Sequence, residues 1–395
     1  MKSYDVVVIG SGLIGVATAY EAVKSGRRTA LLDAKGLSAG ASSANASMLL
    51  LEGSCDCAAF SICMDAVALY ERLDEELGCQ TGFGELGHIS LLEKESEFAP
   101  AAAASAFYRS RGLDSAILTR EEVARREPGL NLETVLGGMY LRQWRIDPIG
   151  TVAGYFHAAR ALGLDWYPHC AAEEFITQGD RLLAVKTPQG DIAGGQFVVA
   201  AGAWTRELLA KLRLFIPEYH ITGAAMICER GAVELRHAVY PFTSPRVAME
   251  QRAAKRIAQV GWERLEREHA NEFVVVPDAN GNLLVCQRSH ASAEFVSRVP
   301  TEYMRDMAQN ALKYFPAFAS ARVLRSWMAP VPFVPDGAPF FGFAAPYGNL
   351  FISSGFGSVL IMAPAIAKLT SRLLGGGTVP YDLGAFDPMR FSKEV

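Results

Sequence analysis

Three glycines near the start of the chain have the spacing of a phosphate-binding turn. Gly10, Gly12 and Gly15 form the pattern G-x-G-x-x-G directly after an apolar run at residues 4–9. The first glycine permits a tight turn, the second lets the backbone approach a pyrophosphate, and the third lets a helix pack against the strand. The N-terminus of that helix offers free N–H groups and a partial positive charge to the phosphates. The pattern therefore predicts a dinucleotide-binding site.

An acidic residue stands at the distance that such a site requires. A helix-compatible stretch at residues 16–24 and a short apolar run at residues 29–32 connect the glycines to Asp33. A carboxylate at this position can accept both ribose hydroxyls of an adenosine. We expect a β-α-β unit that holds a dinucleotide. The alternative is a glycine-rich turn in some other α/β protein.

Two later segments favour FAD over a nicotinamide cofactor. Residues 40–47 are a run of small and hydroxyl side chains, which let the backbone wrap a long buried cofactor and can donate hydrogen bonds to phosphate. An apolar run at residues 197–200 ends in A-x-G, where Gly202 allows the chain to approach the cofactor closely. The alternative for the first segment is an ordinary polar loop. Together, in this order, the segments predict a buried FAD.

In this order, the motifs resemble those of the D-amino-acid-oxidase-type FAD-dependent oxidoreductase family, which includes glycine oxidase, sarcosine oxidase and the flavin subunits of heteromeric amino-acid dehydrogenases. The similarity runs nearly end to end and includes the segments at residues 145–148, 334–339 and 349–357. Family members place the last of these loops over the flavin ring. The motifs and the resemblance together predict FAD contacts from Gly10, Gly12, Leu13, Ile14, Gly15, Asp33, Ala34, Lys35, Ser42, Ser43, Ala44, Asn45, Ala46, Ser47, Ala201, Gly202, Trp204, Gly355, Phe356, Gly357 and Ser358.

The length and the resemblance predict two domains. A chain of 395 residues exceeds what one hydrophobic core usually supports. The fold class that the resemblance implies is α/β (α+β overall), with a Rossmann-like FAD-binding domain into which an antiparallel-sheet substrate domain is inserted. The FAD-binding domain is expected at residues 1–84, 147–217 and 325–395, and the substrate domain at residues 85–146 and 218–324.

Periodic patterns predict the elements that position these motifs. Asp147 and Pro148 are suited to the start of a helix, and Asn280 and Gly281 to the turn of a hairpin. Helices are expected at residues 63–77, through most of 98–126, and at 148–162, 303–314 and 363–374. Strands are expected at residues 87–92, as a strand–turn–strand unit at 185–199, and as a hairpin at 274–285.

The resemblance implies an oxidation that the flavin drives. The flavin accepts a hydride at N5 from the carbon beside an amine, and water hydrolyses the resulting imine. No side-chain base is required, so no catalytic residue is assigned. The helix at residues 363–374 is expected to direct its N-terminus, through residues 355–358, at the flavin ring and to stabilise negative charge there. The alternative is a plain turn before a helix.

Two departures from the family pattern concern the substrate. Val331 stands near the place of an arginine that pairs with the substrate carboxylate in many family members, and residues 354–359 lack a histidine and a glycine. Valine cannot replace a bidentate arginine. Arg246 is the candidate for the missing cation, expected on strands that face the flavin; the alternative is a surface arginine after a proline turn. The other candidate substrate contacts are Met48, Phe356 and Arg288.

Within the family, the chain resembles most the flavin (B) subunits of agrobacterial octopine and nopaline oxidases. We therefore expect oxidative deamination of a secondary amine such as an opine, in a heteromeric dehydrogenase whose partner subunits carry further redox cofactors. The charged stretch at residues 250–268 is either a docking surface or a solvated helix face. Two alternatives stay open: a stand-alone glycine or D-amino-acid oxidase, and a non-catalytic flavin subunit that relays electrons.

The composition argues against other classes of function. A net charge of −4 without a dominant basic face disfavours nucleic acid as a partner. Seven scattered cysteines indicate reduced thiols in a cytoplasmic protein, and Cys55 and Cys57 alone do not make a metal site. The glycines and Glu21 interrupt the apolar N-terminal stretch, which disfavours a signal peptide. We expect no transmembrane helix, which would need about 18 uncharged apolar residues.

Overall fold

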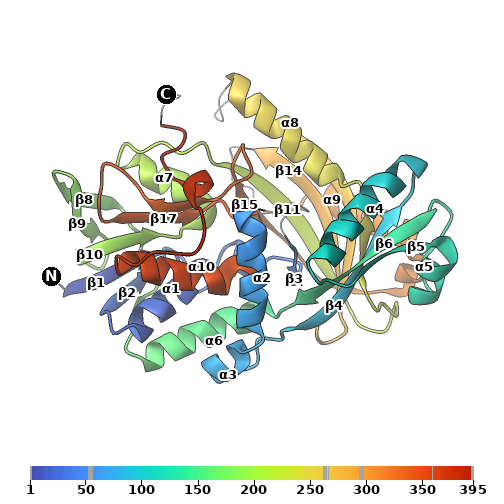
Figure 1. The fold of residues 1–395 in the computed structure, drawn as a ribbon, viewed down its shortest axis with the longest axis horizontal. Coiled ribbons are helices and arrows are strands. Elements are labelled where there is room, and N and C mark those ends of the chain that lie inside the picture. The colour runs from blue at the N-terminus through green and yellow to red at the C-terminus, as the bar shows by residue number, and fades with distance from the viewer. Residues whose placement is uncertain are drawn as a thin grey trace.

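Two β-sheets organise the protein, one in each half of the molecule (Figure 1). The structure is a computed structural model, and it describes residues 2–51, 57–260, 265, 267–292, 298–357 and 359–392. The first sheet carries the N-terminal β-α-β unit. The first strand of the second sheet follows this β-α-β unit in the chain, and most of the other strands of that sheet come from the middle of the chain.

The first sheet is mainly parallel and holds the phosphate-binding turn. Its strands are β1 (Lys2–Ile9), β2 (Thr29–Leu32), β7 (Asp165–Tyr167), β8 (Glu174–Gln178), β9 (Arg181–Lys186), β10 (Ile192–Val199), β16 (Phe340–Phe343) and β17 (Leu350–Ser354). Among the described residues, the order is β16-β17-β10-β1-β2-β7, with β9 beside β10 and β8 beside β9. Val6 and Val8 face one core cluster and Val7 faces another, so β1 is buried on both faces.

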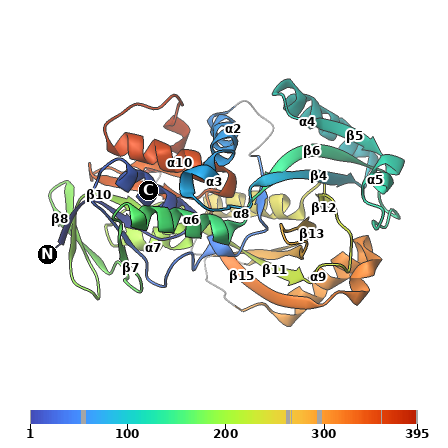
Figure 2. The same cartoon turned by 90° about the horizontal axis from the view of Figure 1, so that it is seen from below.

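Helices α1 (Leu13–Lys24), α6 (Pro148–Ala161) and α10 (Val359–Leu374) pack together on one face of the first sheet. α1 contacts both of the others, and α10 also contacts α2 (Ala58–Tyr70). The short helix α3 (Leu73–Leu77) contacts α6, and Figure 2 shows these helices from below. On the opposite face, α7 (Thr205–Ala210) contributes Leu208 and Leu209 to the second core cluster of this sheet.

The second sheet is antiparallel except for one pair of strands. Its strands are β3 (Met48–Leu49), β4 (Gly84–Leu92), β5 (Ser115–Thr119), β6 (Gly137–Arg145), β11 (Tyr219–Cys228), β12 (Ala238–Pro241), β13 (Glu268–Pro277), β14 (Leu283–Ser292) and β15 (Val323–Phe333). Within the described residues, the order is β15-β11-β14-β13-β12-β4-β6-β3, with β5 beside β6, and β12 and β4 are parallel. Helix α8 (Pro245–Val260) packs on one face and α9 (Thr301–Tyr314) on the other.

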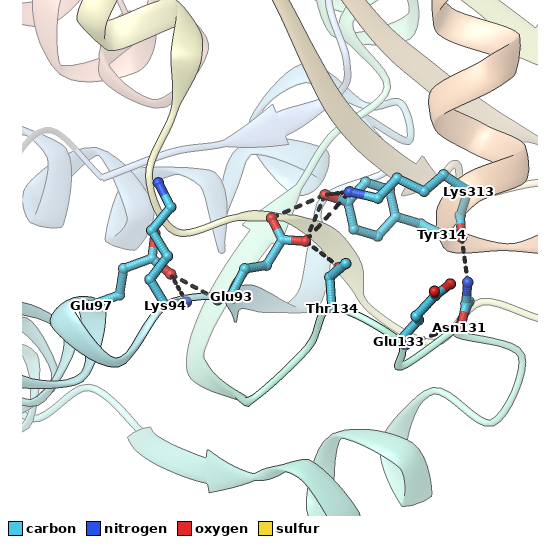
Figure 3. A network of polar contacts seen from close by, with 8 residues as sticks. All are labelled: Glu93, Lys94, Glu97, Asn131, Glu133, Thr134, Lys313 and Tyr314. Carbon is cyan, nitrogen blue, oxygen red and sulfur yellow. Dashed lines mark hydrogen bonds and ion pairs between the residues drawn. The ribbon is translucent and has the colours of Figure 1, made fainter.

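A partly buried polar network ties α9 to the end of β4 (Figure 3). Glu93 accepts hydrogen bonds from Thr134 Oγ1 at 2.5 Å and from the Tyr314 hydroxyl at 3.1 Å, and the Lys313 ammonium lies 3.6 Å from the same carboxylate. Burial and the negative charge of Glu93 raise the pKa of Tyr314, so its hydroxyl stays a donor. The Tyr314 ring also stacks on Phe273, with 4.4 Å between centroids. The network therefore fixes the C-terminal end of α9 on the sheet.

Most of the predicted elements are present. α6 begins at Pro148, and the Asp147 carboxylate accepts a hydrogen bond from Ile149 N at 3.0 Å, as expected of a helix cap. The predicted strand at residues 87–92 belongs to β4, and the predicted helix at residues 303–314 belongs to α9. The hairpin around Asn280 and Gly281 is β13–β14, and β9 and β10 flank the other predicted turn.

Two helix predictions are wrong in part. β5 interrupts residues 98–126 between α4 (Phe98–Ser110) and α5 (Arg120–Arg126), because its residues pair with β6 from Ser115 to Thr119. Residues 63–77 are divided between α2 and α3. Pairing across the sheet overrides the local helical pattern in the first case. The boundaries of the two domains stay a prediction.

Helix α10 begins at Val359, before its predicted start, and contains Pro364. Proline has no N–H to donate to the carbonyl four residues earlier, which is that of Leu360. The buried hydroxyl of Tyr70 donates to this carbonyl instead, at 2.5 Å. A side chain from α2 therefore completes the backbone hydrogen bonding of α10.

We expect Tyr70→Phe to lower the free energy of unfolding by about 1–3 kcal/mol, because a buried carbonyl loses its partner. In a Pro364→Ala background the new N–H can bond to the Leu360 carbonyl, so the same substitution should lower stability by less. Chemical denaturation of the four proteins measures both differences. An equal loss in the two backgrounds would contradict this account of Tyr70.

Candidate active site

In the turn between β1 and α1, Gly12 is less tightly enclosed than Gly10 and Gly15. A Cβ on Gly10, whose φ is +107°, would lie 2.3 Å from the Ala200 carbonyl oxygen, and a Cβ on Gly15 would lie 1.9 Å from the Gly10 oxygen. Among the described residues, the nearest atom to a Cβ on Gly12 would be Ser42 Oγ, at 3.1 Å. Gly12 is also the N-cap of α1, so bare backbone and the first helical N–H groups can approach a pyrophosphate.

The run of small residues after Asp33 returns to this turn. Ser42 lies in a short 3-10 helix at Ala41–Ser43, and its Oγ accepts a hydrogen bond from Leu13 N at 2.9 Å. The hydroxyl keeps its own proton to donate, so Ser42 can both cap α1 and meet a phosphate oxygen. The loop therefore supplies a side-chain donor where the glycines supply only backbone.

Four donors hold the Asp33 carboxylate in place. Oδ2 accepts hydrogen bonds from the N–H and the hydroxyl of Ser11, each at 2.9 Å, and Oδ1 accepts from Lys35 N at 2.8 Å and Gly36 N at 3.0 Å. A carboxylate offers about four lone-pair sites. A ribose hydroxyl that donates to Asp33 must therefore share a carboxylate oxygen with one of these donors or displace that donor. The sequence pattern does not reveal this competition.

A cavity of about 320 Å³ begins at this turn and runs between the two sheets to β15. Predicted FAD contacts that line it are Gly10, Gly12, Leu13, Ile14, Asp33, Ala34, Lys35, Ser42, Ala201, Gly202, Trp204, Gly355 and Phe356. Predicted contacts that do not line it are Gly15, Ser43, Ala44, Asn45, Ala46, Ser47 and Gly357. Ser358 lies outside the described residues. The FAD contacts of individual residues stay predictions.

The cavity also has walls that the motifs do not indicate. Residues 170–172 line it because β7 pairs with β2 in parallel, which places the carboxyl end of β7 beside Asp33. Cys170 N donates to the Asp33 carbonyl at 2.8 Å. Lys35 lies over the Trp204 ring, 4.7 Å from its centroid. β7 is only three residues long, so no periodic pattern in the sequence points to it.

The far wall of the cavity comes from the second sheet. Pro330, Val331 and Pro332 of β15 line it, and Val331 pairs with Ile221 of β11. The position where the family resemblance suggests an arginine is thus at the cavity wall, and its side chain is apolar. Phe356, which is buried, lines the cavity from the loop after β17.

Arg246 is not on a strand, so that part of its prediction is wrong. It lies in the first turn of α8, does not line the cavity, and forms ion pairs with Glu250 and, at 3.9 Å, with Glu272. Its guanidinium lies 6.0 Å from the centroid of the Phe333 ring. Phe333 and Val331 are two residues apart on β15 and so share a face of the sheet. Arg246 therefore lies near the apolar wall, with its charge already compensated.

Of the three other substrate candidates, Phe356 lines the cavity, whereas Arg288 and Met48 do not. Arg288 pairs with Asp306 at 3.2 Å and lies over the Tyr303 ring on the α9 side of the sheet. Arg288 pairs with Ala224 of β11, whereas Val331 pairs with Ile221 of the same strand. Because Ile221 and Ala224 are three residues apart, they point to opposite faces of the sheet, and so do the side chains of Val331 and Arg288. The structure places Met48 in β3, packed among apolar side chains of the second sheet.

A family model described as FAD dependent oxidoreductase matches residues 5–373. The chain belongs to this family. Its cofactor is FAD, and the cavity fits that group: bare backbone at Gly12, helical N–H groups for the pyrophosphate, and Asp33 at the ribose-binding distance. The protein is therefore a FAD-dependent oxidoreductase.

With the family model, the relatives indicate an enzyme that acts on amino acids or amines. Glycine oxidase from Geobacillus kaustophilus is 26% identical over 99% of this chain and 98% of its own, and its crystal structure matches with a TM-score of 0.85 at 24% identity over 99% of both chains. Sarcosine oxidase subunit beta from an Arthrobacter species is 27% identical over 90% of this chain and 83% of that protein. Dimethylglycine dehydrogenase from Rattus norvegicus is 25% identical over 98% of this chain, which spans 45% of its length. The predicted fold class is confirmed.

Two sequence expectations concern features that this oxidoreductase should lack. In the part of the chain that the structure describes, no helix combines the length and apolarity needed to cross a bilayer. In the same part, no group of three or more His, Cys, Asp or Glu side chains is placed to hold a metal ion. Cys55 lies outside the described residues.

Proposed function

We propose that this FAD-dependent oxidoreductase oxidises the secondary amine of an N-substituted amino acid, namely an opine such as octopine or nopaline. FAD, when bound, accepts the hydride from the carbon beside the amine. The chain itself binds the cofactor, keeps water from the reacting end and orients the substrate. The observation that carries the proposal is the apolar wall of Pro330, Val331 and Pro332, because a small amino acid would need a cation there.

The named relatives support an N-substituted substrate. Sarcosine and dimethylglycine, which appear in the names of two of them, are N-methylated forms of glycine. An enzyme for such amines must accommodate a substituent on nitrogen beside the flavin. An apolar wall in place of an arginine leaves room for a larger substituent than a methyl group, which favours an opine.

The group around Arg246 suits a substrate that carries several charges. Octopine and nopaline each have more than one carboxylate and a guanidinium group. Arg246 with Glu250 and Glu272 is a cluster of mixed charge near the apolar wall. A substrate carboxylate can replace one glutamate at Arg246, and the released glutamate can then accept the cationic group of the substrate. The cluster therefore offers partners for both kinds of charge.

We further propose that the chain is the cytoplasmic flavin subunit of a heteromeric dehydrogenase. The name of sarcosine oxidase subunit beta supports this, since it denotes one subunit of a larger enzyme. Helix α8 turns Ala253 and Ile257 to the sheet and exposes Lys255 and Arg256, a basic surface suited to an acidic partner. Of the predicted docking stretch, residues 261–264 and 266 lie outside the described residues.

Anaerobic reduction of the bound flavin by a panel of amines tests the substrate. Octopine and nopaline should bleach the oxidised-flavin absorption faster than sarcosine, proline or glycine at equal concentration. Fastest reduction by glycine would favour a stand-alone oxidase and contradict the proposal. No reduction by any compound would favour the electron-relay alternative.

Reoxidation and copurification test the heteromeric role. Once reduced, the flavin of the isolated chain should react slowly with oxygen and quickly with an artificial electron acceptor. Expression together with the products of neighbouring genes should yield a stable complex. Rapid turnover with oxygen, with peroxide as product, by the chain alone would contradict this part of the proposal.

A further inference from the structure

A buried carboxyl group lies directly behind the wall of the FAD cavity. Glu218, the residue before β11, is fully buried, and its Oε2 accepts a hydrogen bond from the Ser354 hydroxyl at 2.7 Å. Ser354 ends β17 and lines the cavity beside Gly355. Oε1 of Glu218 has no hydrogen-bond partner among the described residues. An ionised carboxylate in this position is costly, because burial removes its water and one hydrogen bond replaces little of it.

The charged groups around Glu218 do not neutralise it. Arg206 donates from Nη1 to the backbone oxygen of Glu218 at 2.6 Å and from Nη2 to the Glu207 carboxylate at 2.5 Å. Burial and the charge of Arg206 lower the pKa of His220 to about 4, so His220 is neutral at physiological pH. Burial raises the pKa of Glu218 to about 8, because the opposing effects of Ser354 and Arg206 are smaller and Glu207 adds to the rise. Glu218 therefore changes its charge close to physiological pH.

The protonation state of Glu218 decides what Ser354 offers to the cavity. A serine hydroxyl has one proton. When Glu218 is ionised, Ser354 donates that proton to it and presents lone pairs to the cavity. When Glu218 is protonated, the acid can donate to Ser354 Oγ instead. The serine proton is then available to the Gly202 oxygen, 3.4 Å away, or to a ligand in the cavity.

We propose that Glu218 is a positioning residue for FAD: through Ser354, its carboxyl group determines whether the cavity wall offers the cofactor a hydrogen-bond donor or an acceptor. Glu218 does not line the cavity, so it acts on the cofactor only through the serine. Neither residue belongs to the glycine motif or to the substrate candidates. The proposal holds whichever amine is the substrate.

The dissociation constant of FAD and the absorption spectrum of the bound flavin test the proposal when both are followed across a pH range that brackets about 8. In the unmodified protein both should pass through one transition, with a change in affinity of about twofold to tenfold, the net worth of one hydrogen bond. Glu218→Gln and Ser354→Ala should each abolish the transition. Ser353→Ala should retain it, because this neighbour also lines the cavity but forms no described hydrogen bond with Glu218.

Three outcomes would overturn the proposal. The first is an FAD affinity and a flavin spectrum that do not depend on pH in the unmodified protein. The second is an unchanged transition in Glu218→Gln or in Ser354→Ala. The third is loss of the transition in Ser353→Ala, which would show that the effect does not depend on the pair of Glu218 and Ser354.

The apoprotein supplies a readout that does not depend on FAD. Because the pKa of Glu218 is raised on folding, the folded state binds more protons than the unfolded state between pH 4.5 and about 8. Its contribution to stability therefore falls as the pH rises through that range. Glu218→Gln should remove this fall in melting temperature, and Ser354→Ala should leave most of it. A Glu218→Gln apoprotein with an unchanged dependence on pH would also overturn the proposal.

Discussion

Gly12→Val should abolish FAD binding while leaving the protein folded. The φ of Gly12 is −67°, which valine adopts without strain, so the substitution makes no demand on the backbone. A valine side chain would extend past Ser42 Oγ into the cavity, where the pyrophosphate approaches the turn. The variant should purify without the yellow colour of flavin and should not gain it when FAD is added. Its melting temperature should fall only slightly, because the Cβ would lie 3.1 Å from Ser42 Oγ and this capping side chain must shift to make room.

Gly15→Val is the matched control for this result. Its Cβ would lie 1.9 Å from the Gly10 carbonyl oxygen, so this variant should lose stability as well as cofactor. Gly12→Val thus tests the space that FAD occupies, and Gly15→Val tests the packing that the fold requires. A Gly12→Val protein with a normal flavin content and spectrum would contradict the assignment of the cofactor site.

Arg246→Ala should weaken substrate binding by about tenfold or more, without a change in FAD content. The loss of one charge-assisted contact with a substrate carboxylate is worth roughly 1.5–3 kcal/mol. The lower end of this range applies here, because the carboxylate replaces a glutamate that already pairs with Arg246. The substitution also removes the Arg246 cation from buried Glu272, so the variant should lose some stability. Anaerobic titration of the bound flavin with the best amine of the panel measures the affinity, and thermal unfolding measures the stability.

Arg252→Ala is the control on the same helix. Its side chain is 56% exposed and pairs with Glu268, so its removal should leave substrate affinity unchanged. If Arg246→Ala leaves the affinity unchanged too, Arg246 does not hold the substrate. Arg288, the other predicted cation, is on the opposite face of the sheet from Val331, so it would be an unsuitable replacement unless the strands rearranged.

Features that depend on neighbours in the chain could be predicted from the sequence. The glycine motif, the strand before it and Asp33 all lie within a short segment, and the turn geometry requires those residue types whatever surrounds them. The Asp147 cap and the turn at Asn280 and Gly281 are local in the same way. The dinucleotide site was predicted from motifs of this kind, whereas the family and the fold class were predicted from the resemblance that the ordered motifs carry.

Only the tertiary structure decided which distant residues meet. An alanine-rich stretch contains β5 because β6 offers it partners, and Pro364 is accommodated within α10 because Tyr70 supplies the missing donor from another helix. The apolar wall at Val331 depends on where β15 lies against the cavity. A sequence pattern records polarity and spacing, whereas these contacts depend on how whole elements pack.

The chemistry of the site likewise depends partly on local sequence motifs and partly on how distant residues pack. The sequence by itself determined a dinucleotide site, because phosphate and ribose recognition uses a short and continuous motif. FAD and the oxidoreductase family were predicted from the later segments and from the resemblance that the ordered motifs carry, and the family model agrees. The sequence did not indicate Glu218, since a glutamate between a proline and a strand reads as an ordinary exposed carboxylate. Burial behind Ser354 changes that carboxyl's pKa, and burial is a property of the packed molecule alone.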